Sequence, residues 1–261
     1  MLDQVGRATA GALGGAGELF LFGFRALRDL FRPPYEFQET IRQLHELGFR
    51  SAPLIAVSGV AVGIVLSMHT RASLERFGAE SLIPAGLALA LVRETGPLTA
   101  ALLLSGRIGA GIGAELGAMR VTEQIDALEA SAVDAFKYLV VTRTVACVIA
   151  LPILTTIMNF CGMLGGFLAE QAASGMSLRL YFNRAFSLID MTDYVPATVK
   201  TMVFGFIIAV TSSYLGFTTS RGTEGVGRAS TRAVVLSSIL IIVSNVILVR
   251  IIFFLFPQMG A

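Results

Sequence analysis

The stretch ELGAMRVTEQIDALEASAVDAFKYLVVTR, residues 115–143, is the longest polar insertion in the middle of a very apolar chain. Its apolar residues recur at helical spacing, at Val121, Ile125, Leu128 and Ala132. Acidic residues fall off that stripe, so the pattern predicts a short amphipathic helix over about 119–132, held at a membrane surface between two spans. On periodicity alone, an ordinary solvated loop helix fits the pattern at least as well.

The composition of the whole chain identifies a membrane protein. Hydrophobic residues make up 54% of the 261 residues, charged residues only 15%, and the mean hydropathy is +0.74, whereas a soluble domain carries about 25% charged residues. The basic residues are scattered, so the formal charge of +2 does not imply nucleic-acid binding. The sequence holds no Gly-Lys-Ser/Thr run and therefore no P-loop. If the chain works with ATP, a partner subunit must bind the nucleotide.

Hydropathy runs predict five transmembrane spans, at about 52–68, 82–114, 138–169, 195–217 and 233–256. Ahead of them, Phe20, Phe24, Leu27 and Phe31 alternate with arginines, as in an amphipathic helix that lies in the membrane interface. A second amphipathic stretch leads into the first span as an elbow. We therefore expect an all-α polytopic membrane protein with N-terminal interfacial and elbow helices in 1–50 and a transmembrane domain in 51–261.

Loop charges predict the orientation of these spans. Lys and Arg number six in the first 50 residues and three in the loop 218–232, and the segment 115–143 adds three more. The other two loops carry two each, and the C-terminal tail carries none. The positive-inside rule then puts the N-terminus, the segment 115–143 and the loop 218–232 in the cytoplasm. An odd number of spans puts the C-terminus outside.

Neither metal binding nor catalysis is indicated by the sequence. Cys147 and Cys161 are 14 residues apart in one apolar run, or about 21 Å along a helix, too far for a disulfide. His45 and His69 are isolated from each other and from carboxylates at ligand spacing. The Gly-x-Ser-Gly pattern of an intramembrane serine protease is absent from the sequence. We assign no metal site and no catalytic residue.

Four motifs together resemble one transporter family. The segment reads Glu-x-Gly-x-Met-x-Val-x-Glu-Gln-Ile-Asp-Ala-Leu at 115–128. Three further motifs are Val-Arg-Glu-x-Gly-Pro at 92–97, Ser-Gly-Arg-x-Gly-Ala at 105–110 and Ala-Ser-Thr-Arg-Ala-Val-Val at 229–235. Over essentially its whole length the chain resembles the MlaE/YrbE-type permease subunits of MCE-associated lipid ABC transporters.

The resemblance implies a function and a set of partners. The chain would be a permease that forms a homodimer in the bacterial inner membrane, with cytoplasmic ATPase subunits and a periplasmic ring of MCE-domain protein. It would move phospholipid and maintain outer-membrane lipid asymmetry, with ATP bound by the partner and no cofactor of its own. Related permeases for sterol, other lipids or solvent remain alternatives. The segment would be the cytoplasmic coupling helix between spans 2 and 3, contacting the ATPase through Glu115, Met119, Glu123, Gln124, Ile125, Asp126 and Leu128.

Charged residues inside the second span are the candidate substrate contacts. Arg93 and Glu94 lie about a dozen residues into the span, or roughly 18 Å along a helix, near mid-bilayer. An ionised group there costs at least ~2.5–3.5 kcal/mol. Adjacent helical residues point about 100° apart, so the two should find separate partners. They either fix packing or line a lipid pocket, the role that the resemblance favours; Arg232 is a weaker candidate.

Glycines in the second span predict close helix packing. Gly109, Gly113 and Gly117 recur at four-residue intervals, which lets a neighbouring helix approach closely. Two other functional classes fit the sequence less well. A secondary transporter usually shows internal repeats, and none is visible here. A non-transporting membrane anchor would have no polar groups inside its spans, whereas Arg93 and Glu94 lie inside one.

Overall fold

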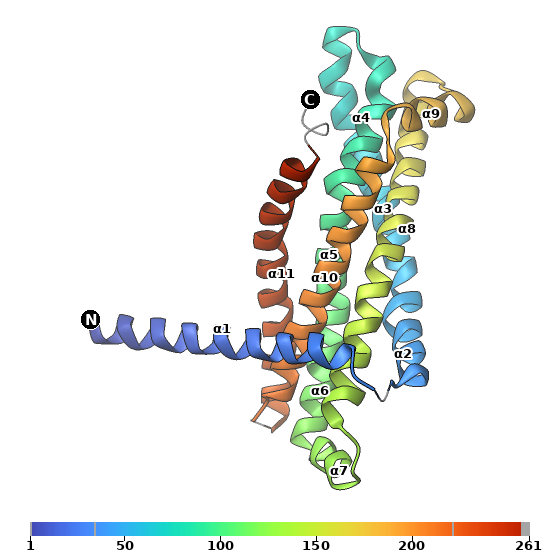
Figure 1. Ribbon diagram of the computed structural model, residues 1–261. Coiled ribbons are helices and arrows are strands. Elements are labelled where there is room, and N and C mark those ends of the chain that lie inside the picture. Colours follow the sequence, from blue (N-terminus) through green and yellow to red (C-terminus); the bar gives the residue numbers. More distant parts are fainter. Residues whose placement is uncertain (1, 34, 221, 257–261) are drawn as a thin grey trace. The chain divides into compact units, whose positions relative to one another are not determined.

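The computed structural model describes residues 2–33, 35–220 and 222–256 (Figure 1). All regular elements in these ranges are helical. Five helical runs are long and apolar enough to cross a membrane, namely Phe37–Phe77, Glu80–Val121, Lys137–Ser174, Met191–Phe217 and Gly222–Leu255. The predicted all-α polytopic fold with five spans is therefore confirmed.

The helices extend beyond the apolar runs that predicted them. Helix α3 (Ala52–Leu74) continues past the predicted end at 68, and α10 (Met191–Phe217) begins before 195. Helix α11 (Gly222–Leu255) begins well before 233, so residues 222–232 of the predicted loop 218–232 are helical. Its polar first turns remain helical because Glu224 lies near the positive end of the helix dipole and binds Arg228 at 2.5 Å. Hydropathy does not detect such turns.

The second run is one helical path interrupted by two π-helical turns. Its α-helical parts are α4 (Ile83–Ala90), α5 (Gly96–Leu104) and α6 (Ala110–Val121). The π-helical turns are η5 (Leu91–Thr95) and η6 (Ser105–Gly109). A third such turn, η7 (Lys137–Val141), leads into α8 (Thr142–Ser174). Turns of this kind often occur at functional sites.

A short helix lies where the sequence suggested only a polar loop. Helix α9 (Leu178–Ala185) begins at Ser177, whose hydroxyl oxygen accepts the N–H of Leu180 at 3.4 Å. Tyr181 and Ala185, four residues apart, are buried and belong to a cluster with Leu87 and Leu91. Burial raises the pKa of the Tyr181 hydroxyl, which keeps it neutral.

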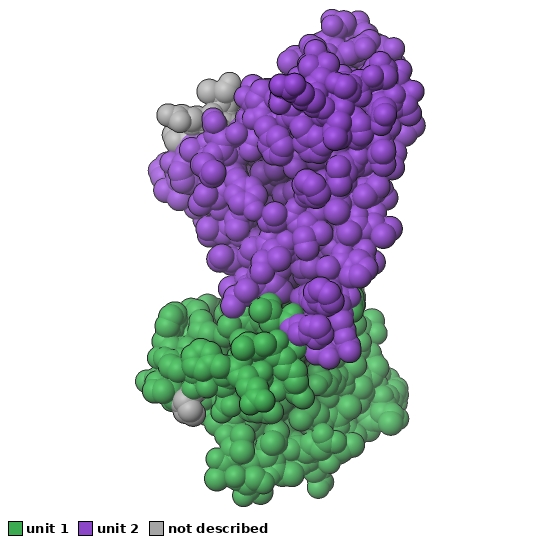
Figure 2. All heavy atoms as spheres, turned by 90° about the vertical axis from the view of Figure 1, so that its right-hand side faces the viewer, with its two compact units in different colours: residues 1–44, 105–147, 206–238 green, residues 45–104, 148–205, 239–261 purple. Residues whose placement is uncertain are grey.

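The described residues form two compact units (Figure 2). Unit 1 takes in the described residues of 1–44, 105–147 and 206–238, and unit 2 those of 45–104, 148–205 and 239–261. In unit 1, an apolar cluster joins α1 (Leu2–Leu30), η7 and α10, through Ala26, Phe136, Val140 and Val210. In unit 2, α3 packs on α8 at glycine contacts, described below for Gly63.

The two N-terminal amphipathic helices turn apolar side chains outward. On α1, Phe20 and Phe24 are 73% and 59% exposed. On the elbow helix α2 (Phe37–Gln43), Phe37 and Ile41 are exposed, whereas Glu39 and Gln43 are buried. Polar groups face the protein and apolar ones face away from it, an arrangement suited to a lipid surface rather than to water.

Candidate functional site

The π-helical turn η5 carries both Arg93 and Glu94, and the two find separate partners. Arg93 Nε donates to Asp193 Oδ1 at 2.7 Å. Lys200 Nζ donates to Glu94 Oε2 at 2.7 Å, and Asn245 Nδ2 donates to Glu94 Oε1. Arg93 and Glu94 therefore have separate partners, as their adjacent positions on a helix imply. The partners themselves lie 100 residues or more away in the sequence, and sequence reasoning did not identify them as site residues.

Two ion pairs join the second run to α10, and they run in opposite directions: the cation comes from the second run in one pair and from α10 in the other. Helix α10 contributes a buried acid, Asp193, whose side chain is 3% exposed, and a buried base, Lys200, at 1%. The second run contributes the half-exposed members, Arg93 at 35% and Glu94 at 41%. Each buried charge is therefore neutralised by a residue whose side chain still reaches the surface.

Lys200 is buried, although it is a charged residue inside the predicted fourth span. Its burial is compensated by two hydrogen bonds: Lys200 Nζ donates to the Glu94 carboxylate and to the carbonyl oxygen of Arg93, at 3.0 Å from the latter. Arg93 binds Asp193, the third residue of α10, and Glu94 binds Lys200, the tenth, so the cluster faces the first part of that helix. Its depth near mid-bilayer stays a prediction.

A small cavity of about 40 Å³ opens at this cluster. A water molecule occupies about 30 Å³ in the liquid, so the cavity cannot enclose a phospholipid. Its lining combines the four charges with apolar side chains, and consists of Arg93, Glu94, Asp193, Pro196, Ala197, Lys200, Val249, Ile252 and Phe253. It offers charged and apolar contacts side by side, as an amphiphilic ligand requires.

Arg232 does not join this cluster. It lies in unit 1 and lines a separate cavity of about 320 Å³, together with the hydroxyl-bearing loop after α10 and Arg228. Its side chain is exposed and makes no hydrogen bond or ion pair with the described residues. The structure therefore separates the three sequence-predicted lipid contacts into two places.

From residue 83 onward, the exposed surface of the second run lacks large apolar side chains. Among the described residues, none from 83 to 132 is a highly exposed large hydrophobic, whereas α3, α8, α10 and α11 all expose several. The exposed residues of its helices from 83 to 121 are Gly86, Gly106, Arg107, Gly111, Glu115, Ala118 and Arg120. Arg107 makes no hydrogen bond or ion pair within the described chain. Lipid-facing helices are covered by apolar side chains, so this surface is not built to face lipid tails.

The predicted helix over 119–132 is divided in the structure. Helix α6 ends at Val121, and α7 covers Gln124–Ala130. Between them, Glu123 adopts a left-handed backbone conformation with φ 59°, which reverses the chain direction. Met119 consequently belongs to α6. Ala132, with φ 61°, adopts a second left-handed conformation just after the end of α7.

Helix α7 directs its apolar stripe into its own chain. Ile125 is 1% exposed and Leu128 is half-buried, so Ile125 packs within its own chain, and its contact with an ATPase stays a prediction. The exposed side carries Glu123, Gln124, Asp126 and Glu129. A periodic stripe marks a buried face without telling whether that face is buried within the chain or against a partner.

Glu115 is also engaged within the chain. Its Oε1 accepts from Arg143 Nη2 at 2.8 Å, although its side chain is 52% exposed. On the neighbouring stretch, Asp126 Oδ1 lies 2.5 Å from Arg120 Nη1. Of the acidic residues on this segment, Glu123 and Glu129 have no ion pair among the described residues.

The glycine stripe of the second run lies against other helices in unit 1. A Cβ atom added at Gly109 would be 3.1 Å from Ser212 Oγ, and one at Gly113 would be 3.1 Å from Ala233 Cβ. At Gly117 it would be 3.2 Å from Thr219 Oγ1. These distances are tighter than ordinary contacts, so a side chain at any of these glycines would require its neighbour on α10, on α11 or just after α10 to shift.

Within the described residues, five candidate spans, ion pairs between them and an acidic helix between the second and third describe a polytopic membrane protein with charged groups inside its spans. The family model described as Permease MlaE matches residues 40–251. The chain belongs to the MlaE permease family and is a multi-pass ABC transporter permease.

Curated relatives agree with this assignment. The chain is 40% identical to a probable ABC transporter permease protein of Rickettsia felis, over 96% of this chain and 97% of that protein. It is 32% identical to the intermembrane phospholipid transport system permease protein MlaE of Haemophilus influenzae, over 93% and 92% of the two chains. It is also 34% identical to the chloroplastic protein TRIGALACTOSYLDIACYLGLYCEROL 1 of Arabidopsis thaliana, over 81% of this chain and 61% of that one.

Proposed function

We propose that this chain is the permease subunit of an ATP-driven phospholipid transporter that maintains outer-membrane lipid asymmetry. It would act as a homodimer in the bacterial inner membrane, with cytoplasmic ATPase subunits and a periplasmic MCE-domain ring. The name of the Haemophilus influenzae relative, a phospholipid transport permease, supports the substrate class. The observation that carries the proposal is the exposed surface of the second run, which is charged and small rather than apolar.

This surface suits the path of a phospholipid headgroup. In unit 2, Arg93 and Glu94 present half-exposed charges of both signs. In unit 1, Arg107 is an exposed cation. Phospholipid headgroups carry a phosphate and often an amine, which charged side chains bind well in a site of low dielectric constant. Gly106 and Gly111 leave open space where a Cβ atom would meet nothing within 4 Å. A second copy of the chain would shield this surface from lipid tails.

Energy must come from a partner, because the sequence has no P-loop. Helix α7 is the natural contact for an ATPase, since its carboxylates at Glu123 and Glu129 are exposed and have no ion pair among the described residues. The exposed Gln124 and the exposed part of the half-buried Leu128 lie on the same helix. Permeases for sterol, another lipid or solvent are the alternative, and mass spectrometry of the lipid that co-purifies with the complex separates these.

Replacing Glu123 tests the ATP-driven part of the proposal. Glu123→Lys should disturb complex assembly or uncouple ATP hydrolysis from lipid transfer, because it reverses an exposed charge on α7. Glu123→Gly is the matched variant: it removes the carboxylate and relieves a left-handed conformation that costs a non-glycine residue about 1–2 kcal/mol. We expect the glycine variant to fold at least as well as wild type and to bind the ATPase more weakly. Normal co-purification with the ATPase and normal transport in both variants would contradict the coupling role.

Thiol labelling tests the proposed orientation, with the N-terminus in the cytoplasm and the C-terminus in the periplasm. In a background lacking Cys147 and Cys161, a single cysteine replaces either Ser73 or Ser131, both of which are exposed. Ser73→Cys should react with a membrane-impermeant thiol reagent in intact cells, and Ser131→Cys only after permeabilisation. The reverse pattern would overturn the orientation and, with it, the docking of α7 on a cytoplasmic ATPase.

A further inference from the structure

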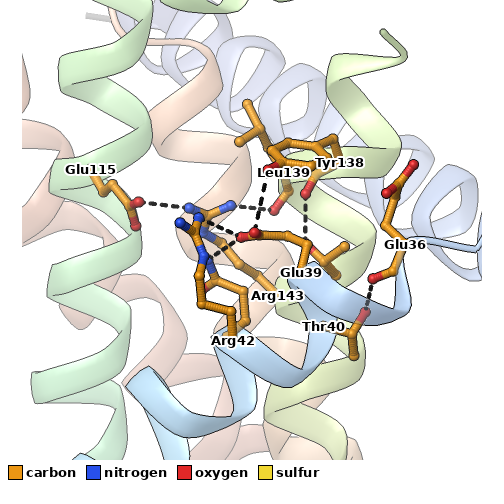
Figure 3. Close-up of polar contacts among 10 residues, drawn as sticks. Glu36, Glu39, Thr40, Arg42, Glu115, Tyr138, Leu139 and Arg143 are labelled. Carbon is orange, nitrogen blue, oxygen red and sulfur yellow. Dashed lines mark hydrogen bonds and ion pairs between the residues drawn. The ribbon is translucent and has the colours of Figure 1, made fainter.

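The polar segment 115–143 is closed by an ion pair between its own ends (Figure 3). Glu115 Oε1 accepts from Arg143 Nη2 at 2.8 Å, so the first and last residues of the segment are joined although 28 positions separate them. The two members differ in environment: the Arg143 side chain is 1% exposed and that of Glu115 is 52% exposed. We refer to Glu115 and Arg143 as the clamp.

The buried member of the clamp is also fixed to the turn that precedes it. Arg143 Nη1 donates to the carbonyl oxygen of Leu139, in η7, at 2.9 Å. Its Nε is buried and has no hydrogen-bond partner in the described chain. Within the described residues, Glu115 makes the only ion pair of Arg143. The position of Glu115 therefore decides whether this buried charge is neutralised at close range.

Three consecutive residues of η7 connect the clamp to the N-terminal helices. Lys137 Nζ donates to the carbonyl oxygens of Arg32 at 3.3 Å and Pro33 at 2.9 Å, just after α1. The Tyr138 hydroxyl donates to Glu39 Oε2 of the elbow helix α2 at 3.3 Å. Leu139 accepts from Arg143, as described above. One turn of chain thus holds α1, α2 and the clamp.

The elbow side of this network is itself firmly held. Glu39 is 6% exposed, and its Oε1 accepts from Arg42 Nη2 at 2.8 Å and from Gln43 Nε2 at 2.7 Å. Figure 3 shows Glu115, Arg143 and Glu39 converging from three different helices. Helix α7 is held to the rest of the chain by the burial of Ile125 and by the ion pair of Asp126 with Arg120 of α6, the helix that carries Glu115. A displacement of α7 can therefore reach Glu115 through α6 and Arg143 through the chain that follows α7.

We propose that the clamp positions the coupling segment, so that a displacement of α7 reaches the start of the third span and the elbow helix together. This inference rests on the proposed function, in which α7 docks on an ATPase. Glu115 and Arg143 act here as positioning residues: they transmit the displacement and do not touch ATP or lipid. Opening the clamp would let α7 move on its own, and ATP would be hydrolysed without moving lipid.

The test uses the complete complex of permease, ATPase and MCE protein, reconstituted in phospholipid vesicles. Glu115→Gln removes the charge of the exposed member and keeps its shape. The ATPase should remain bound, while the amount of lipid moved per ATP hydrolysed falls by about 5-fold or more, the lower end of ordinary coupling effects. The matched control is Glu46→Gln, which removes an exposed ion pair with Arg50 at 2.7 Å and should leave this ratio unchanged.

A double variant separates transmission from folding. Glu115→Leu with Arg143→Met removes both charges, so no buried charge is stranded and the chain should fold; it should nevertheless remain uncoupled. A wild-type ratio of lipid to ATP in either clamp variant would reduce the pair to a packing contact. Loss of the ATPase from the Glu115→Gln complex would make Glu115 a direct contact and overturn its positioning role. A wild-type permease that retains no ATPase would overturn the proposed function, and the clamp with it.

Discussion

Replacing Glu94 by leucine is expected to destabilise the folded permease by about 3–5 kcal/mol, the usual cost of breaking a buried ion pair by removing one partner. The substitution leaves the Lys200 ammonium, 1% exposed, without the carboxylate that lies 2.7 Å from it. Only the neutral carbonyl oxygen of Arg93 would remain as an acceptor. Because Glu94 itself is 41% exposed, water can reach part of the site, and the lower end of this range is the more realistic.

Two companion variants distinguish packing from lipid binding. Glu94→Gln keeps an oxygen that can accept from Lys200 and should lose much less stability. Glu94→Leu combined with Lys200→Met strands no charge and should recover most of it. Thermal unfolding in detergent measures stability, and mass spectrometry measures the bound lipid. If Glu94 contacts lipid, the Gln and double variants fold but change lipid occupancy. If every one of these variants that folds also retains lipid and transports it normally, Glu94 is not a site residue.

The second large effect is expected at Gly63, where α3 meets α8. A Cβ atom on Gly63 would lie 1.9 Å from the carbonyl oxygen of Gly162 and 2.6 Å from its carbonyl carbon. These are backbone atoms, so Gly63→Ala can be accommodated only if the two helices move apart. Overpacking of this kind costs about 1–3 kcal/mol, occasionally more. We expect a marked loss of thermal stability and of expression.

The matched control is the same substitution at Gly86, in α4 of the same unit. A Cβ atom there would meet nothing within 4 Å, and alanine is favoured over glycine in a helix by about 1 kcal/mol. Gly86→Ala should therefore unfold at the same temperature as wild type or slightly higher. Equal unfolding temperatures for the Gly63 and Gly86 variants would show that the α3–α8 contact is looser than the structure indicates.

Much of the fold was predictable, because membrane spans have a strong and simple signal. A run of about 20 apolar residues is long enough to cross the hydrocarbon core, and the described ranges contain five helices that are long and apolar enough. The ends of the helices were not predictable from hydropathy, since the turn around Glu224 is polar and yet helical. Helix α9 was not predicted because its apolar residues do not mark one face: Tyr181 and Ala185 are buried, whereas Leu178 and Leu180 are exposed.

The candidate site was predictable only in part. Charges inside the second run at Arg93 and Glu94 stand out against apolar neighbours, and helical geometry gives them separate partners. Which partners they find depends on how distant helices pack. Lys200 could equally have extended toward water, and Asn245 had no sequence signal at all. Similarly, periodicity marked Ile125 as part of a buried stripe, but only the packed chain shows that it is buried internally.

The inward-facing stripe of α7 has a practical consequence for handling the proposed complex. With Ile125 buried in its own chain, the helix offers a partner mainly the carboxylates of Glu123 and Glu129. Contacts between exposed charges are screened over about 8 Å at physiological ionic strength and over about 3 Å in 1 M salt. An ATPase held here would therefore wash off in concentrated salt while surviving detergents that strip lipid. Buffer composition, more than the choice of detergent, would decide whether the intact assembly is isolated.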